Sequence, residues 1–215
     1  MTLTIREPGS AITHGIALLM AMLAAAPLLV KASASSPLCL EAMTVFISSM
    51  ILLYAASTIY HSVTVPPRVL KVFRKADHMM IFVLIAGTYT PVCLLTLGHQ
   101  LGMRMCAVIW LLAAAGMIIK MCWITCPKWF SSVIYIAMGW SCVFVLRPIA
   151  DSLGAGGMAW LAAGGVIYTV GGVIYALKVP LFDARHANFG SHEIFHLFVM
   201  GGSLCHFICM YKYVA

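Results

Sequence analysis

Two histidines four residues apart stand at the start of the last apolar segment of the chain. His192 and His196 belong to the stretch His-Glu-Ile-Phe-His at 192–196, which is followed by an almost uncharged run to Tyr211. On a helix, the two imidazoles lie on one face at a spacing that lets both bind one metal ion. Ionisable side chains are unfavourable in a membrane segment and usually mark a functional site. The spacing therefore indicates a metal site, and zinc is the ion that we expect.

Polar residues also lie near the ends of two earlier apolar segments. Ser57 and His61 lie near the end of one segment, and Asp77 stands at the start of another. Three neutral imidazoles that leave a fourth position to water form the catalytic type of zinc site. We predict that His61, His192 and His196 bind Zn²⁺, and that Asp77 and Ser57 are catalytic residues beside it.

The stretch 192–196 also matches H-E-x-x-H, the zinc-protease pattern in which the glutamate is the general base. The extended form of that pattern has Gly and a third His downstream, where this chain has Val199 and Gly202. No aspartate follows the stretch, so the partner expected in intramembrane metalloproteases is missing. We therefore disfavour a protease and leave the role of Glu193 open.

The amino-acid composition indicates whether these segments lie in water or in a membrane. The 215-residue chain is 63% hydrophobic and 9% charged, against about 45–50% and 25% for soluble domains. Its apolar runs are continuous rather than alternating, which excludes a membrane β-barrel. We predict an all-α integral membrane protein whose scattered cysteines are small packing side chains. The net charge of +7 lies in short loops without the motifs of a nucleic-acid binder, so we expect no nucleic-acid partner.

Seven segments approach or reach the roughly 20 residues that cross a bilayer. Glycines and prolines separate them, for example Pro66 and Pro67 and the run Gly154–Gly157. We predict a seven-transmembrane helix bundle, with residues 1–215 forming one domain that has a short cytoplasmic segment at 1–10. The predicted spans are Ala11–Val30, Leu40–Ser62, Asp77–Leu97, Met103–Trp123, Phe130–Leu146, Met158–Leu177 and His192–Tyr213.

A cleaved signal peptide is the alternative for the first span. Ala32, Ser33 and Ala34 resemble a cleavage site after an apolar run. The region before that run, however, holds only Arg6 beside an acidic residue, and His14 would fall within the apolar part. We favour a helix that is retained.

The basic residues predict the orientation of the bundle. Seven spans divide the loops into two sets, one with nine Lys and Arg residues and one with four. By the positive-inside rule, the N-terminus is cytoplasmic and the C-terminus is outside. The nine are Arg6, Arg68, Lys71, Arg74, Lys75, Lys120, Lys128, Lys178 and Arg185, and the four are Lys31, Arg104, Arg147 and Lys212.

This topology brings the predicted site residues to one depth. His61 ends an inward span, whereas Asp77, His192 and His196 begin outward ones, so all four lie near the cytoplasmic ends of their helices. Ser57 lies one helical turn, about 6 Å, deeper than His61 on the same face.

The other histidines are given different roles. His78 points to another face than its neighbour Asp77, so we expect it to support the site or cap a helix. His206 lies about 15 Å from His196 along the same helix and cannot bind the same ion. His99 and His186 are predicted in loops, and His14 lies with Glu7 near the cytoplasmic end, where their roles stay open.

In these motifs the chain resembles the bacterial hemolysin III branch of the progestin and adipoQ receptor family. One departure lies near the start, where the family pattern E-x2-N-x3-H is represented by Glu7, Ser10 and His14, with Ser in place of Asn. The resemblance implies a bacterial inner (plasma) membrane protein with seven helices, an inward N-terminus and zinc on the three histidines named above. The motifs that carry it are S-x3-H at 57–61, Ala-Asp-His at 76–78 with the run 84–91, Ala-Met-Gly-Trp at 137–140, and H-x3-H at 192–196 with Gly-Gly-Ser at 201–203.

The family is also similar to alkaline ceramidases in its set of Ser, Asp and three His. This similarity implies zinc-dependent hydrolysis of a lipid amide near the cytoplasmic leaflet, with a membrane lipid or fatty-acid-like ligand. Zinc would lower the pKa of its bound water to about 7, Asp77 would transfer the proton, and Ser57 would donate to the developing oxyanion. The alternatives are a zinc-bearing sensor or membrane-homeostasis protein without turnover, and a cytolysin of the hemolysin type.

Overall fold

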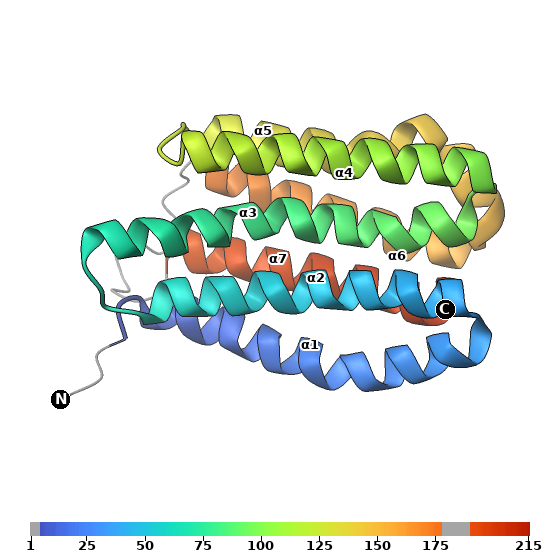
Figure 1. Cartoon of the computed structure of the whole chain (residues 1–215), viewed down its shortest axis with the longest axis horizontal. Helices are drawn as coiled ribbons and strands as arrows, with labels where there is room; N and C mark the ends of the chain where they lie inside the picture. The colour runs from blue at the N-terminus through green and yellow to red at the C-terminus, as the bar shows by residue number, and fades with distance from the viewer. Residues whose placement is uncertain (1–4, 178–189) are drawn as a thin grey trace.

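The computed structural model describes residues 5–177 and 190–215, and almost all of them are helical (Figure 1). Within these ranges there is no β-strand, as predicted for an all-α protein. The helices are α1 (Pro8–Ser35), α2 (Pro37–Ser62), α3 (Pro67–Pro91), α4 (His99–Cys122), α5 (Lys128–Gly139), α6 (Leu146–Leu177) and α7 (Ser191–Cys209). Short π-helical turns follow α3 (Val92–Thr96) and α7 (Met210–Val214), and a 3₁₀ segment (Trp140–Val145) joins α5 to α6.

Proline begins three of these helices. Pro8, Pro37 and Pro67 occupy the first turns of α1, α2 and α3, where the missing N–H would have no helical partner in any case. Ser36 caps α2, because its hydroxyl accepts the N–H of Cys39 at 3.1 Å. The connections from α1 to α2 and from α2 to α3 are therefore short, because a new helix begins within a few residues of the end of the previous one.

Six helical segments within the described ranges are long and apolar enough to cross a membrane. The prediction of separate spans at Phe130–Leu146 and Met158–Leu177 differs from the structure, which joins them in one segment, Lys128–Leu177, of 50 residues. The loop expected at Gly154–Gly157 is reduced to a kink at Gly154, which has φ 63° and ψ −179°. Glycine adopts this left-handed conformation without steric cost, so helical hydrogen bonding resumes on both sides of a single residue.

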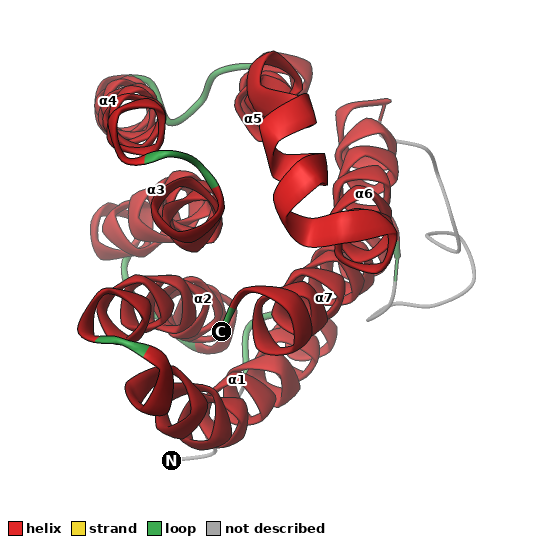
Figure 2. Cartoon of the chain, turned by 90° about the vertical axis from the view of Figure 1, so that its right-hand side faces the viewer, coloured by secondary structure: helices red, strands yellow, loops and turns green. Residues whose placement is uncertain are grey.

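The helices run lengthwise beside one another, and the chain reverses at the two ends of the bundle (Figure 1). Seen down the helices, α4, α3, α2 and α1 follow in an arc, and α7, α6 and α5 complete the outline (Figure 2). The segment after α5 crosses the end of the bundle to reach α6 in the same view. The first and last helices, α1 and α7, therefore lie side by side.

One end of the bundle gathers the predicted site residues. The last turn of α2 and the first turns of α1 and α7 lie at the end that is on the left in Figure 1. Helix α3 begins at Pro67, ten residues before the predicted start at Asp77. The basic residues that precede Asp77 are therefore helical rather than part of a loop, and Asp77 lies in the third turn.

Glycines set the distance between α6 and α7. A Cβ atom on Gly164 would overlap the His206 ring, and a Cβ atom on Gly202 would lie 2.8 Å from the Tyr168 ring. A Cβ atom on Gly171 would lie 2.6 Å from Phe198 of α7. The repeat Gly-Gly-Val-Ile-Tyr at 164–168 and 171–175 is thus a helix-packing stripe.

Candidate metal centre

The structure brings the three predicted metal-binding histidines together. His61 comes from the last turn of α2, and His192 and His196 come from the first turns of α7. Their ligating nitrogens all lie within 4.8 Å of one another, and the Nε2 atoms of His61 and His192 are 3.4 Å apart. Zn–N bonds of about 2.0–2.1 Å in a tetrahedron require nitrogens about 3.4 Å apart. The donor set and this spacing fit a zinc ion.

The segment that leads into α1 orients His61. The Nδ1 atom of His61 is hydrogen-bonded to the carboxylate of Glu7, which also accepts from Arg6 at 2.6 Å. The N–H of Glu7 donates to the carbonyl of His61 at 3.0 Å, so main chain and side chain are both held. A carboxylate on Nδ1 fixes the ring and directs Nε2 toward the other two histidines. The role of Glu7, which the sequence left open, is therefore to hold and orient His61.

Helix α1 also contacts His196. The hydroxyl of Thr13 lies 3.1 Å from Nδ1 of His196, and the ring of His14 stacks on the ring of His196 at 3.6 Å between centroids. Sequence reasoning missed Thr13 altogether. The available signal was the polar run at helical spacing in α1, where Ser10, Thr13 and His14 interrupt an apolar span.

Ser57 and Asp77 lie together at the polar end of the bundle cavity. The hydroxyl of Ser57 lies 2.7 Å from Nδ1 of His14. The remaining nitrogen of His14, Nε2, is buried and has no hydrogen-bond partner. The two predicted catalytic residues thus lie in the same cavity as His192 and His196.

Glu193 caps α7 rather than facing the histidines. Its carboxylate accepts the hydroxyl of Ser10 and the N–H of Gly190, the latter at 2.8 Å. Both oxygens are therefore engaged in holding the start of the helix and its contact with α1. This arrangement disfavours Glu193 as the general base of a protease. Ser10, where the family pattern has Asn, still supplies a hydrogen-bond donor.

The other histidines lie apart from the three-histidine group. His78 donates from Nδ1 to the carbonyl of Arg74 at 2.9 Å, one turn earlier on α3. The same nitrogen lies 3.3 Å from an oxygen of Asp77, so the prediction that His78 points to another face than Asp77 is wrong. His206 packs edge-on against Tyr168, with both ring nitrogens unpaired. His99 is exposed as the first residue of α4, and His186 lies outside the described residues, as do Lys178 and Arg185.

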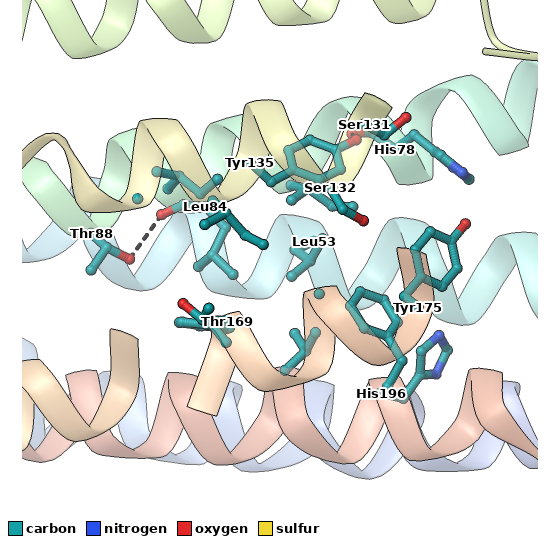
Figure 3. A pocket seen from close by; sticks show the side chains of 18 of the residues that line it. Leu53, His78, Leu84, Thr88, Ser131, Ser132, Tyr135, Thr169, Tyr175 and His196 are labelled. Carbon is teal, nitrogen blue, oxygen red and sulfur yellow. Dashed lines mark hydrogen bonds between the residues drawn. The ribbon is translucent and has the colours of Figure 1, made fainter. Parts of the chain in front are cut away.

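A cavity of about 150 Å³ extends from the metal group into the bundle. Its polar end is lined by Ser57, Asp77, His192 and His196, and its remaining wall is mainly apolar. Figure 3 shows His78, Tyr175 and His196 at one end and Thr88 and Thr169 at the other. Since Thr88 follows Asp77 by eleven residues on α3, the cavity runs for about 16 Å along that helix. An elongated apolar pocket with polar groups at one end suits an amphiphilic ligand.

These features define an all-helical integral membrane protein with a three-histidine group at one end of its helices, in which His61 and His196 are buried and His192 is half-buried. The chain belongs to the haemolysin-III-related family, whose model matches residues 3–207. It is 39% identical to Hemolysin-3 of Bacillus cereus over 209 residues, which cover 97% of this chain and 91% of the relative.

The similarity also extends to a second bacterial relative and to a human protein. The chain is 36% identical to the Hemolysin-3 homolog of Bacillus subtilis (strain 168), over 98% of this chain and 95% of that protein. It is 30% identical to the monocyte to macrophage differentiation factor of Homo sapiens, over 82% of this chain and 72% of the human protein. The family predicted from the motifs is confirmed.

Proposed function

We propose that the protein is an integral membrane zinc enzyme that hydrolyses lipid amides near the cytoplasmic leaflet. The observation that carries this proposal is the position of three imidazole nitrogens, at a spacing that fits tetrahedral zinc, at the polar end of an apolar cavity. A lipid would place its acyl chain along the apolar wall and its amide at Asp77 and the histidines. His61, His192 and His196 would hold the ion.

Zinc in this position would supply a Lewis acid and lower the pKa of bound water to about 7. The residues of the chain supply the proton transfers. Asp77 accepts the proton of the attacking water and delivers it to the leaving amine. Ser57, which lines the same cavity, donates its hydroxyl to the carbonyl oxygen as charge develops there.

We also propose a seven-span topology with a cytoplasmic N-terminus and an outer C-terminus, in a bacterial inner membrane. A straight helix of 50 residues would be about 75 Å long, more than twice the roughly 30 Å of a bilayer core. The kink at Gly154 divides Lys128–Leu177 into two segments, each of which crosses once. The positive-inside asymmetry then places the metal group at the cytoplasmic face.

A zinc-bearing protein without turnover is the second candidate. The observation that favours it is that the histidines and their hydrogen-bond partners join α1, α2 and α7, so an ion there would stabilise the bundle. A lytic function is suggested only by the name Hemolysin-3 of the relatives.

Metal content and lipid turnover test the proposal together. Purified protein should contain about one zinc per chain, and His192→Ala with His196→Ala should remove most of it. The same preparation should release fatty acid from at least one member of a panel of lipid amides. Undiminished zinc in the double variant would refute the metal site, and zinc without any amide hydrolysis would favour the second candidate. His206→Ala is the control that should leave the zinc content unchanged.

A further inference from the structure

A second polar cluster lies between α4 and α5, away from the three histidines. It consists of Lys120 in the last turn of α4, Cys126 in the connection, and Ser131 near the start of α5. The Lys120 Nζ atom lies 2.5 Å from Ser131 Oγ and 3.2 Å from Cys126 Sγ. Cys126 Sγ and Ser131 Oγ are 3.2 Å apart, which closes the triangle.

Burial makes this lysine unusual. Lys120 is 3% exposed and Ser131 is 3% exposed, whereas lysine is almost never buried unless it is paired. Within the described ranges no carboxylate forms an ion pair with Lys120. Its contacts are instead a hydroxyl and a thiol, which are both neutral in their ordinary forms. A lysine amine in hydrogen-bond contact with a serine hydroxyl is in position to accept its proton.

Ser131 connects the cluster to the cavity beside the three histidines. It lines the same cavity as Asp77 and His196, and Figure 3 shows it close to His78 at the polar end. Lys120 is not part of that lining and lies behind the serine. A hydroxyl that faces a ligand, with an amine behind it, is the arrangement of a nucleophile and its base.

We propose that Ser131 and Lys120 form a metal-independent acyl-transfer centre that acts on lipid esters or amides in this cavity. Ser131 Oγ forms a bond to the acyl carbon while the Lys120 amine takes the hydroxyl proton. The bond to the leaving alcohol or amine breaks, and Lys120 returns the proton to it. Water then attacks the acyl-serine, with the proton passing again through Lys120, and releases a fatty acid and free Ser131.

The neighbouring serine provides an internal comparison. Ser132 is also 3% exposed and also lines the cavity, and Figure 3 shows it beside Ser131. It lacks the contact with Lys120. Only Ser131 should therefore react as a nucleophile, although both hydroxyls face the same ligand.

A long-chain alkyl fluorophosphonate tests the proposal on the purified full-length protein. The probe bonds to an activated serine oxygen through phosphorus and releases fluoride, and peptide mass spectrometry locates the adduct. We expect one adduct at Ser131, no adduct in Ser131→Ala, and unchanged labelling in Ser132→Ala. Lys120→Arg keeps a cation and its hydrogen bonds but provides no base, so labelling should slow by about 100-fold or more. Lys120→Met, which is neutral and of similar length, should show the same loss.

A chelator separates this centre from the proposed zinc enzyme. Labelling of Ser131 should persist at the same rate after the metal has been removed, so the two proposals fail or succeed independently. The proposal is overturned by an absent adduct, by an adduct at Cys126 or Ser132 instead, by labelling that requires metal, or by an unchanged rate in folded Lys120→Arg or Lys120→Met protein. Size-exclusion elution and thermal unfolding establish that each variant is folded.

Discussion

Glu7 and Thr13 orient two histidines of the proposed metal site. Each lies at the Nδ1 atom of one histidine, Glu7 on His61 and Thr13 on His196, which leaves the Nε2 atoms directed at the shared centre. Partners of this type usually change metal affinity by 10–100-fold when they are removed.

Glu7→Gln should therefore lower zinc affinity by about 10–100-fold. The amide still offers an oxygen to His61 Nδ1 but loses the negative charge that strengthens the bond and holds Arg6. Competition with a chromophoric chelator measures the change. Glu41→Gln is the matched control, because Glu41 is exposed on α2 and far along the helix from His61. Equal affinities in the two variants would contradict the assigned role of Glu7.

Asp77→Asn separates proton transfer from metal binding. The amide keeps the shape and can still form a hydrogen bond, but it cannot accept the proton that the proposed hydrolysis transfers. We expect zinc to be retained and lipid-amide turnover to fall by about 100-fold or more. His61→Ala, in comparison, should lose zinc as well. If Asp77→Asn turns over as fast as the wild type, Asp77 is not the base.

Helical spacing was sufficient to predict that His192 and His196 share one face, and His61, which the motifs also indicated, lies beside them in the structure. The partners of these residues were not predictable in the same way. Which residue of α1 contacts His196 depends on the rotation of α1 against α7, and no periodicity determines that rotation. Lys120 was counted as a loop cation for topology, whereas the structure buries it within α4.

At the scale of the helices, the close contact between α6 and α7 depends on glycines, which have no side chain to separate the two backbones. Gly164→Ala should destabilise the protein by about 1–3 kcal/mol, because the new methyl group overlaps the His206 ring and the close packing must open. Gly165→Ala adds the same methyl group one residue later, where the nearest atom is 3.9 Å away on Trp140. Denaturant unfolding in detergent measures both, and comparable losses would argue against the packing stripe.

Two helix boundaries differ from the sequence prediction, and each difference has its own physical cause. Basic residues before Asp77 suggested a loop, but Pro67 is favourable at the start of a helix, and long side chains such as Arg68 and Lys71 extend into solvent. The glycines at 154–157 suggested a loop as well. Only Gly154 leaves the helical conformation, because one left-handed residue is enough to redirect the chain.

At the scale of the whole molecule, the proposed function and the proposed topology both require the metal group to lie on the cytoplasmic side of the membrane. In a cysteine-free background, Val69→Cys should react with a membrane-impermeant maleimide only after the cytoplasmic face is opened. Ala155→Cys should react from outside in intact cells. Both positions are exposed, and Ala155 avoids the strained position at Gly154. Reaction of both from one face would refute the proposed topology and the cytoplasmic position of the metal group.

The hydrogen bonds between α1 and α7 also have a consequence for biosynthesis. Glu7 and His192 are separated by 185 positions, so at about 5–20 residues per second the ribosome needs about 10–40 s between the two. During that interval the polar face of α1 can meet His61 but neither histidine of α7. The proposed set of metal ligands is therefore complete only after α7 has been inserted. A metal ion that binds all three histidines would bind after that step.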